Sequence, residues 1–267
     1  AEEKILAECG EVNAQFQNIF SMIDNADIRF GEIVSPQGEK IELTHGTYGV
    51  ILHGDDRELR KRAFEQYYAS YIALTNTIAA TYYGNVKKDV FAAKVRKYDS
   101  CLQRALEGED VATCVYENLL EAVHKYLPSM HHYIALRKKI LNLDEQHMYD
   151  IYAPLVKDAE LKLDYEDACD LVVRGLSPLG EEYCGLLRKG FSEGWVDVCE
   201  STGKRSGAYS TGMFGLHPYV LLNYQKTTHD VFTIAHEMGH SLHTYYSNAA
   251  QPYAKADYRI FVAVVAS

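Results

Sequence analysis

Apolar side chains recur every three or four residues over long stretches of this 267-residue chain, which is the spacing of one face of an α-helix. Similar patterns cover residues 4–22, 86–106, 111–141 and 254–267, and two more begin near Asp164 and Ser177. In the stretch 55–80 the pattern is carried by Leu59, Ala63, Tyr67, Tyr71, Leu74 and Ile78. With 47% hydrophobic residues, the chain has enough apolar side chains to bury a core. These patterns predict a mainly α-helical fold.

Local signals predict where these helices begin and end. Asp55 and Glu58 have the spacing of a capping box. Gly84-Asn85 predicts a break between two helices, and Pro128 predicts an end or a kink at Leu127. Ser177-Pro178 suits an N-cap followed by the first helical position.

Two segments depart from the helical pattern. Residues 28–44 read as a β-hairpin around Ser-Pro-Gln-Gly, and the glycine-rich and aromatic stretch 203–224 contains a short buried strand near Tyr219. We therefore expect a mostly helical, channel-forming region over residues 1–200. Residues 201–267 are expected to hold a small β element beside a helix that carries the chemistry.

Composition excludes several classes of protein. The net charge of −10 argues against nucleic acid as a partner, and the basic run Arg57 to Arg62 is interpreted as a solvated helix face. No apolar run approaches the roughly 18 residues of a membrane span, and no signal peptide is visible at the N-terminus. Six cysteines without a Cys-x-x-Cys pair favour reduced thiols and a cytoplasmic location.

The sequence His236-Glu237-Met-Gly-His240 lies within an apolar-periodic segment. A helix brings residues four apart onto one face, so the two imidazoles can bind one zinc ion. Glu237 is then placed to take a proton from a metal-activated water and pass it to a leaving amine. This motif predicts hydrolysis of a peptide bond.

A catalytic zinc site needs a third protein ligand. One class of such sites places a glycine seven residues and a histidine ten residues after the first motif histidine, where this chain has His243 and Tyr246. That class is excluded. A second class uses a carboxylate on a following helix, and Asp257 is the sole acidic residue after His240. Asp257 more readily fits the first turn of a helix, where a carboxylate is favourable.

The motif and its surroundings together resemble the oligoendopeptidase F family of thimet-oligopeptidase-like zinc peptidases. The resemblance covers essentially the whole chain, and its strongest stretches are Gly203–Ser210, His217–Tyr224 and Asp230–Ser247. It implies a helical, zincin-like peptidase domain that cleaves short peptides. It also implies that the family extends before residue 1 and after residue 267, so we expect this chain to be a central section of a longer protein.

In this family the third zinc ligand is implied to be a glutamate in a Phe-x-Ala-Glu-Val-Ala-Ser run. This chain reads Phe261-Val-Ala-Val264-Val-Ala-Ser, so Val264 occupies the ligand position. Valine cannot bind zinc. We therefore expect one weakly held zinc or none, and impaired peptidase activity. The alternative is a catalytically inactive helical fragment or paralogue without stable zinc, whose partner is the remainder of a parent protein.

Other residues have competing interpretations. His243 is a stand-in ligand, a group behind the ligands, or a packed histidine, and packing is favoured. His229 is interpreted as an exposed residue at the start of the motif helix. Cys199 and His217 form a conceivable nucleophile pair that nothing around them supports. Residues 207–209, namely Gly207, Ala208 and Tyr209, suit an edge strand that binds a peptide backbone, or a plain loop.

Overall fold

The computed structural model describes residues 2–156 and 161–265, and most of these residues are helical, as predicted. The chain forms two compact units, each assembled from two stretches of sequence. Unit 1 comprises Ala1–Leu43 and Gly54–Leu155, and unit 2 comprises Thr44–His53 and Val156–Ser267.

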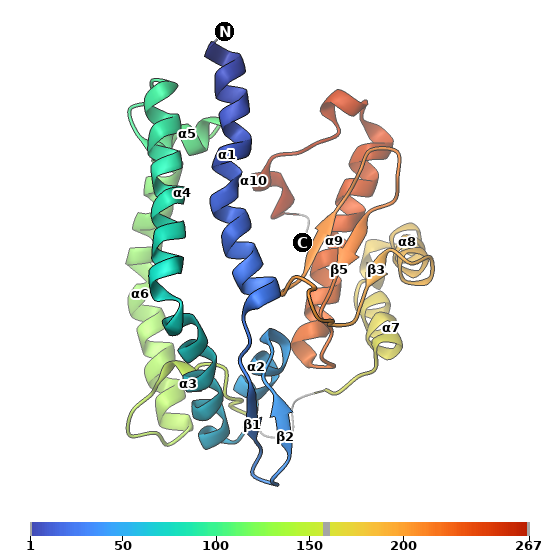
Figure 1. Ribbon diagram of the computed structural model, residues 1–267. Coiled ribbons are helices and arrows are strands. Elements are labelled where there is room, and N and C mark those ends of the chain that lie inside the picture. The colour runs from blue at the N-terminus through green and yellow to red at the C-terminus, as the bar shows by residue number, and fades with distance from the viewer. Residues whose placement is uncertain (1, 157–160, 266–267) are drawn as a thin grey trace. The chain divides into compact units, whose positions relative to one another are not determined.

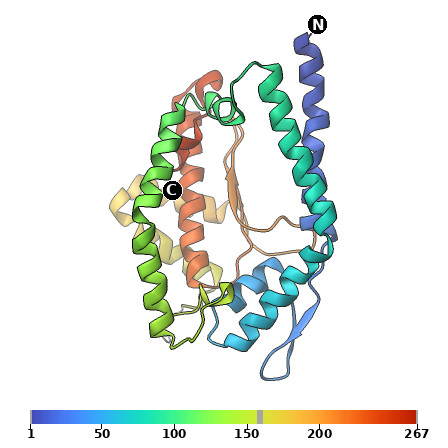
Figure 2. The same cartoon turned by 90° about the vertical axis from the view of Figure 1, so that its left-hand side faces the viewer.

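Unit 1 is built from long helices and one hairpin (Figures 1 and 2). The predicted hairpin is confirmed, because β1 and β2 pair in antiparallel register with Ile33 opposite Ile41. A π-helical turn at Ile23–Asp27 follows α1, and a 3-10 turn at Met148–Asp150 follows α6. The elements are α1 (Glu2–Met22), β1 (Glu32–Val34), β2 (Lys40–Glu42), α3 (Arg57–Ala73), α4 (Thr75–Val95), α5 (Cys101–Glu107) and α6 (Thr113–Ile140).

The predicted break at Gly84-Asn85 is wrong, because α4 continues through both residues. Gly84 instead allows α4 to approach α1 closely, since a Cβ at this position would overlap with the ring of Phe16. The break lies at Leu74, where the hydroxyl of Thr75 donates to the carbonyl of Ile72 at 2.6 Å. Tertiary packing, which local propensity does not encode, decides the role of this glycine.

Two further predictions about helix boundaries need correction. Pro128 lies inside α6, so the helix does not end at Leu127, and the alternative of a kink stays a prediction. The cap of α3 is Asp56 rather than Asp55, and its carboxyl accepts from the backbone N–H of Leu59 at 2.9 Å. Both differences concern single residues in segments that are helical as predicted.

The basic run at the start of α3 is only partly a solvated face, because Arg62 is exposed whereas Arg60 is buried. Asp150, which is fully buried, accepts two hydrogen bonds from Arg57, both at 3.0 Å, and one from Arg60 at 3.1 Å. Arg60 is 4% exposed and also donates to the carbonyl of Gly54. The carboxylate that neutralises these arginines lies about ninety residues along the chain. No pattern around Arg57 could reveal it.

Unit 2 combines short helices with a small mixed sheet, which Figure 1 shows beside α9. The sheet has the order β3-β5-β4, with β3 parallel and β4 antiparallel to the central strand. The elements are α2 (His45–Leu52), α7 (Tyr165–Gly175), α8 (Glu181–Ser192), β3 (Val196–Asp197), β4 (Tyr209–Thr211), β5 (Tyr219–Leu221), α9 (Thr228–Ala250) and α10 (Ile260–Ala263).

The predicted helix starts in unit 2 are partly correct. Asp164 immediately precedes α7, as expected. Ser177-Pro178 opens a 3-10 turn, and α8 begins only after Gly180. The predicted helix over 254–267 is reduced, within the described residues, to a 3-10 turn at Tyr253–Lys255 and the four-residue α10.

A hydrophobic core in unit 2 holds α9 against α7, α8 and the sheet. Its largest members with less than 2% exposure include Trp195, Leu187, Ile234 and Met238. Gly190 of α8 faces Trp195 and Met238 so closely that a Cβ there would lie within 3.0 Å of both. The motif helix is therefore anchored along one side by tightly packed neighbours.

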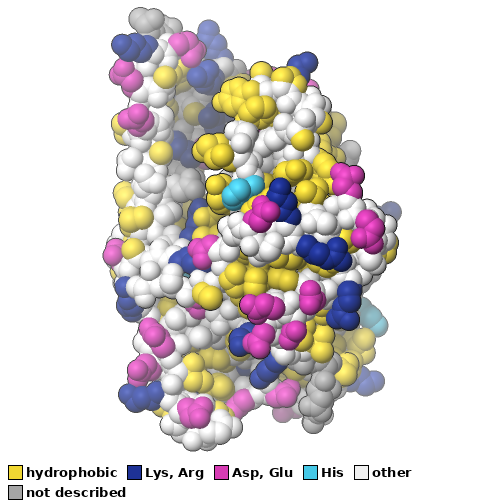
Figure 3. Space-filling model, turned by 90° about the vertical axis from the view of Figure 1, so that its right-hand side faces the viewer, with side chains coloured by type: hydrophobic (Ala, Val, Ile, Leu, Met, Phe, Trp, Pro, Cys, Tyr) yellow, Lys and Arg dark blue, Asp and Glu magenta, His cyan; other side chains and the backbone are white. Residues whose placement is uncertain are grey.

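In the described part of the chain, no helix is both long and apolar enough to cross a membrane. On the face shown in Figure 3, Lys and Arg side chains are interspersed with Asp and Glu, and hydrophobic side chains lie between them. On this face, basic and acidic side chains are therefore mixed.

Candidate functional site: a histidine pair and a buried glutamate beside an edge strand

The start of α9 is fixed by a capping box. Thr227 accepts from the backbone N–H of Asp230, and the Asp230 carboxylate accepts from the backbone N–H of Thr227 at 2.8 Å. The same carboxylate also accepts from the backbone N–H of Gln225 at 3.1 Å. These bonds satisfy free N–H groups at the helix start. They also set the rotation of the helix, and with it the direction of the motif side chains.

His236 and His240 lie one turn apart on α9. Their ring centroids are 4.7 Å apart and the rings are nearly perpendicular, at 87°. His236 is exposed and His240 is partly buried. The pair offers two imidazole donors on one helix face, as the motif predicted, which is the pattern that suits zinc.

Glu237 is 7% exposed although it carries a carboxylate. Burial raises its pKa, while His236, His240 and a hydrogen bond from the backbone N–H of Ser210 act in the opposite direction. A carboxylate with a raised pKa binds a proton more readily near neutral pH, as a general base requires. Ser210 belongs to β4, and its hydroxyl lies 2.8 Å from that of Ser241, one turn after the glutamate.

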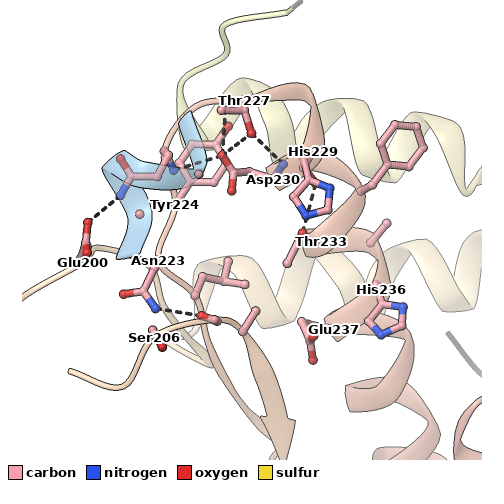
Figure 4. Close-up of a pocket in the computed structure, with 18 of the residues that line it drawn as sticks. Glu200, Ser206, Asn223, Tyr224, Thr227, His229, Asp230, Thr233, His236 and Glu237 are labelled. Atoms are coloured by element: carbon pink, nitrogen blue, oxygen red, sulfur yellow. Dashed lines mark hydrogen bonds between the residues drawn. The ribbon is translucent and has the colours of Figure 1, made fainter. Parts of the chain in front are cut away.

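A cavity of about 960 Å³ within unit 2 opens beside this helix. Figure 4 shows His236 and Glu237 projecting from neighbouring positions of α9, with Glu237 on the side of the sheet. Gly207 and Ala208 line the same cavity, whereas Tyr209 lies next to them on β4 and is 39% exposed. Part of the opposite wall is α2, a helix from the N-terminal part of the chain.

Asn223 holds the glycine-rich segment in place. Its side-chain amide donates to the carbonyls of Arg205 and Gly207, at 2.9 and 2.8 Å. Figure 4 shows Asn223 beside Ser206 in the cavity wall. The segment is therefore tied to the residues that follow β5, and it forms a defined wall.

A catalytic zinc requires three protein ligands, and the predicted ligands His236 and His240 offer two imidazoles. No cluster of three or more His, Cys, Asp or Glu side chains suited to a metal ion occurs in residues 2–156 and 161–265. Val264 follows α10 and is 64% exposed, and its neighbour Val265 lines the cavity. Asp257 is exposed and accepts from the backbone N–H of Tyr258. The donor set therefore fits zinc in part.

Three further histidines that the sequence analysis considered pack against aromatic rings. The His243 ring stacks on Tyr258 at a centroid distance of 3.7 Å, and burial lowers its pKa. His217 stacks on Trp195 at 5.3 Å with nearly parallel rings. His229 is exposed in the first turn of α9, and its ring stacks on that of His53. Each of the three rings therefore packs against another aromatic ring.

Sequence reasoning did not single out Ser241, Asn223 or α2. Ser241 lies four residues after Glu237 and is fully buried, with its hydroxyl 2.8 Å from that of Ser210. The helical spacing places Ser241 beside the glutamate, so this part was visible in the sequence. The partner strand and the α2 wall depend on long-range contacts, which the sequence pattern does not show.

Comparison with known proteins shows the family of this chain. Residues 50–267 match the model of peptidase family M3. The chain is 48% identical over 266 residues to oligopeptidase PepF of Bacillus subtilis (strain 168), covering 100% of this chain and 40% of that protein. It is 42% identical to an oligoendopeptidase F homolog of Lactococcus lactis subsp. lactis (strain IL1403), covering 100% of this chain and 44% of that protein.

Solved structures of other proteins share the fold of this chain. The crystal structure of oligoendopeptidase-F from Enterococcus faecium matches with a TM-score of 0.64 and 30% identity, over 100% of this chain and 40% of that one. PZ peptidase A with inhibitor 2 shares the fold, with a TM-score of 0.82 at 17% identity over 96% of this chain and 45% of that one. The chain thus spans less than half the length of these relatives. It belongs to peptidase family M3, within the oligoendopeptidase F group.

Proposed function

We propose that this chain is the motif-bearing segment of a zinc-dependent endopeptidase that hydrolyses short peptides. The observation that carries the proposal is the buried Glu237, which lines a large cavity next to His236 and one turn before His240. The names of the relatives, oligopeptidase and oligoendopeptidase, support the same reaction class.

In this proposal His236 and His240 hold the metal. Zinc supplies Lewis acidity, which brings the pKa of a water near neutrality. Glu237 accepts the proton of the attacking water and delivers it to the leaving amine. Its burial keeps competing solvent away from the carboxylate, and its raised pKa suits both steps.

The peptide backbone would lie along Gly207, Ala208 and Tyr209. An extended peptide can add to the edge of a sheet through main-chain hydrogen bonds, and β4 is the outer strand of this one. Gly207 has a φ of +81°, a backbone conformation that residues with a Cβ atom rarely adopt. Short peptides are therefore the proposed substrates and partners.

A cytoplasmic location forms part of the same proposal. All six cysteines are free thiols in the structure. Disulfides are rare where the surroundings are reducing, so the thiols support this compartment.

A second candidate is a catalytically inactive member of the family without stable zinc. It is favoured by Val264, whose aliphatic side chain stands where the resemblance implies a metal-binding carboxylate. A site with two imidazoles and no carboxylate also leaves more positive charge on the metal. Both effects weaken zinc binding.

Calorimetric zinc titration separates the two candidates. We expect weak binding by the chain as it stands and tighter binding by Val264→Glu, by more than the roughly 10–100-fold typical of groups behind the ligands. Val262→Glu, in α10 two residues before Val264, is the matched control and should bind zinc as the unchanged chain does. The rate of cleavage of a fluorogenic peptide is measured for the same three chains.

Tight stoichiometric zinc binding by the unchanged chain would show that another residue completes the site. Full peptidase activity in that chain would exclude the inactive candidate. Equal zinc affinity of the Val262→Glu and Val264→Glu variants would remove position 264 from the ligand set.

A further inference from the structure

One wall of the cavity in unit 2 is a single face of α2. It is formed by Gly46, Gly49, Val50 and His53, whose spacing of three, one and three residues places them on the same side of the helix. Among the described residues, nothing beyond its own turn of helix lies within 4 Å of where a Cβ of Gly49 would be. The wall is therefore open at Gly49, whereas Gly46 lies close to two side chains of the cavity.

These two side chains belong to Glu200 and Gln225. A Cβ at position 46 would lie 2.6 Å from Oε2 of Glu200 and 2.5 Å from Nε2 of Gln225, so glycine permits the close approach. The side-chain amide of Gln225 donates to Oε2 of Glu200 at 2.8 Å, and its backbone N–H donates to Asp230 at 3.1 Å. Figure 4 shows Glu200 bound in this way beside the blue helix α2. Glu200 is partly buried, and its carboxylate is thus held at a defined place in the cavity wall.

The charge of Glu200 has no counterion in the described part of the chain. The amide of Gln225 is neutral, and none of the ion pairs among the described residues includes Glu200. Lys204 is the one lysine or arginine among the described lining residues. Its ammonium lies 3.0 Å from Asp197 and also donates to the carbonyls of Asp197 and Cys199. A partly buried carboxylate without a cation favours the binding of a positive group.

The other carboxylates that line the cavity have different roles. Asp230 caps α9, and Glu237 is the proposed general base. The cavity also has apolar side chains, namely those of Val50, Leu176, Leu179, Leu222 and Phe232. A lysine or arginine side chain matches this combination, because its methylene stem packs on apolar surface while its charged head binds a carboxylate.

We propose that Glu200 is a specificity-determining residue, which binds the lysine or arginine side chain of a peptide whose backbone lies along Gly207 and Ala208. The identity of the ligand as a peptide rests on the proposed function. Gly207 and Ala208 line the same cavity, so a peptide along this segment can direct a side chain to Glu200. The preference is a matter of binding and needs neither zinc nor turnover.

Two blocked pentapeptides test this preference: acetyl-Ala-Ala-Lys-Ala-Ala-amide and the same peptide with norleucine in place of lysine. Norleucine keeps a similar stem and lacks the ammonium. In NMR titrations of the full chain without zinc, the lysine peptide should bind about tenfold more tightly, which is the effect of one partly exposed, hydrogen-bonded ion pair. Glu200→Gln should remove the preference, while its amide oxygen still accepts from Gln225 and keeps the wall in place.

Glu193→Gln is the matched control. It removes one negative charge from an exposed residue of unit 2 that is not among the described residues lining the cavity. This variant should keep the full preference for lysine. An equal loss of preference in the Glu193→Gln and Glu200→Gln variants would show attraction by the net charge of −10 alone, and would overturn the inference.

Gly49→Leu tests whether the peptides bind in this cavity. Its side chain would fill the open space beside α2, so both peptides should bind at least about tenfold more weakly. Unchanged binding of the lysine peptide by Gly49→Leu would place the peptide elsewhere and contradict the inference. Equal affinity of the unchanged chain for the two peptides, or no binding of the lysine peptide at millimolar concentration, would contradict it as well.

Cleavage of the same two peptides by the zinc-loaded chain separates this inference from the proposed function. If the preference for lysine depends on Glu200 while neither peptide is cleaved, the binding site stands and the peptidase proposal fails. If both peptides are cleaved at equal rates and Glu200→Gln changes neither binding nor cleavage, the peptidase proposal stands and the role of Glu200 fails.

Discussion

The two units use their apolar residues differently. Unit 2 collects them into a core, with Leu187, Ile234, Met238 and Leu242 almost fully buried around the motif helix. In unit 1 the 28-residue α6 buries only Arg137 among its described side chains. Leu119 and Met130 of this helix are more than half exposed.

Unit 1 also contains a group of buried polar contacts. Arg57 and Arg60 of α3 bind Asp150, and Arg137 of α6 donates to the carbonyls of Asp150 and Ala153. Helical periodicity therefore predicts equally good helices in both units. It does not say whether a helix is held by a core or by a few buried charges.

The largest expected effect concerns the chemistry placed in unit 2. Glu237→Gln removes the proposed general base, so zinc-dependent peptide hydrolysis should fall by at least about 100-fold. Glu121→Gln makes the same change on the exposed face of α6 in unit 1 and should leave the rate unaltered. Steady-state assays with a fluorogenic peptide measure both. Equal rates in the two variants would contradict a role for Glu237.

Breaking the charge cluster should have the largest effect on stability in unit 1. Asp150→Asn leaves Arg57 and Arg60 without their counterion and should lower the free energy of unfolding by about 3–5 kcal/mol at neutral pH. Asp144→Asn, an exposed residue of the preceding segment, should change it by less than about 0.5 kcal/mol. Urea titrations of the three chains make this comparison.

The effect of Asp150 should also depend on pH. Burial raises the pKa of this carboxyl, but hydrogen bonds from Arg57, the backbone of His147 and Arg60 outweigh it, so the pKa lies below its usual 3.8. The stabilisation is thus present above the ordinary pKa and lost as pH falls through the lowered value. A difference between wild type and Asp150→Asn that grew in acid would contradict this sign.

A core substitution tests the hydrophobic side of the comparison. Leu187→Ala in unit 2 should cost roughly 2–5 kcal/mol, because the leucine is completely buried and leaves a cavity. Leu119→Ala on α6 removes the same atoms from a side chain that is 58% exposed. It should cost under about 1 kcal/mol, also measured by urea unfolding. Similar losses would mean that α6 is packed more fully than its exposure indicates.

The smallest expected effect concerns two glycines within helices. Gly84→Ala would press a methyl group into Phe16 and should cost about 1–3 kcal/mol. Gly185→Ala in α8 meets no atom within 4 Å and should stabilise the chain by up to about 1 kcal/mol, since alanine favours helix. Phe16→Leu should relieve part of the Gly84→Ala loss, and thermal unfolding of the double variant checks this.

The features predicted correctly from sequence are those that local spacing determines. The hairpin around residue 36, the start of α7 after Asp164, and the two motif histidines one turn apart all follow from patterns within a few residues. The family resemblance is also confirmed. These features need only backbone preferences and helical periodicity.

The features that the sequence could not reveal depend on partners far along the chain. Gly84 looked like a helix breaker because Phe16, which occupies the space beside it, lies 68 positions earlier (84 − 16). Arg60 looked solvated because Asp150 is 90 residues away. Ser241 gained its significance only from Ser210, across a helix–strand contact.

The discontinuous make-up of unit 2 has a consequence for folding kinetics. Residues 44–53, which contain α2, belong to unit 2, whereas the rest of this unit begins at residue 156. About a hundred residues of unit 1 are therefore synthesised between the two parts of unit 2. Closing so long a loop is slow compared with forming local helices. At a translation rate of roughly 5–20 residues per second, α2 waits at least about 5 s for its partners. During that interval Ile51 and Leu52, which are buried in the folded chain, cannot yet pack against any residue after position 155.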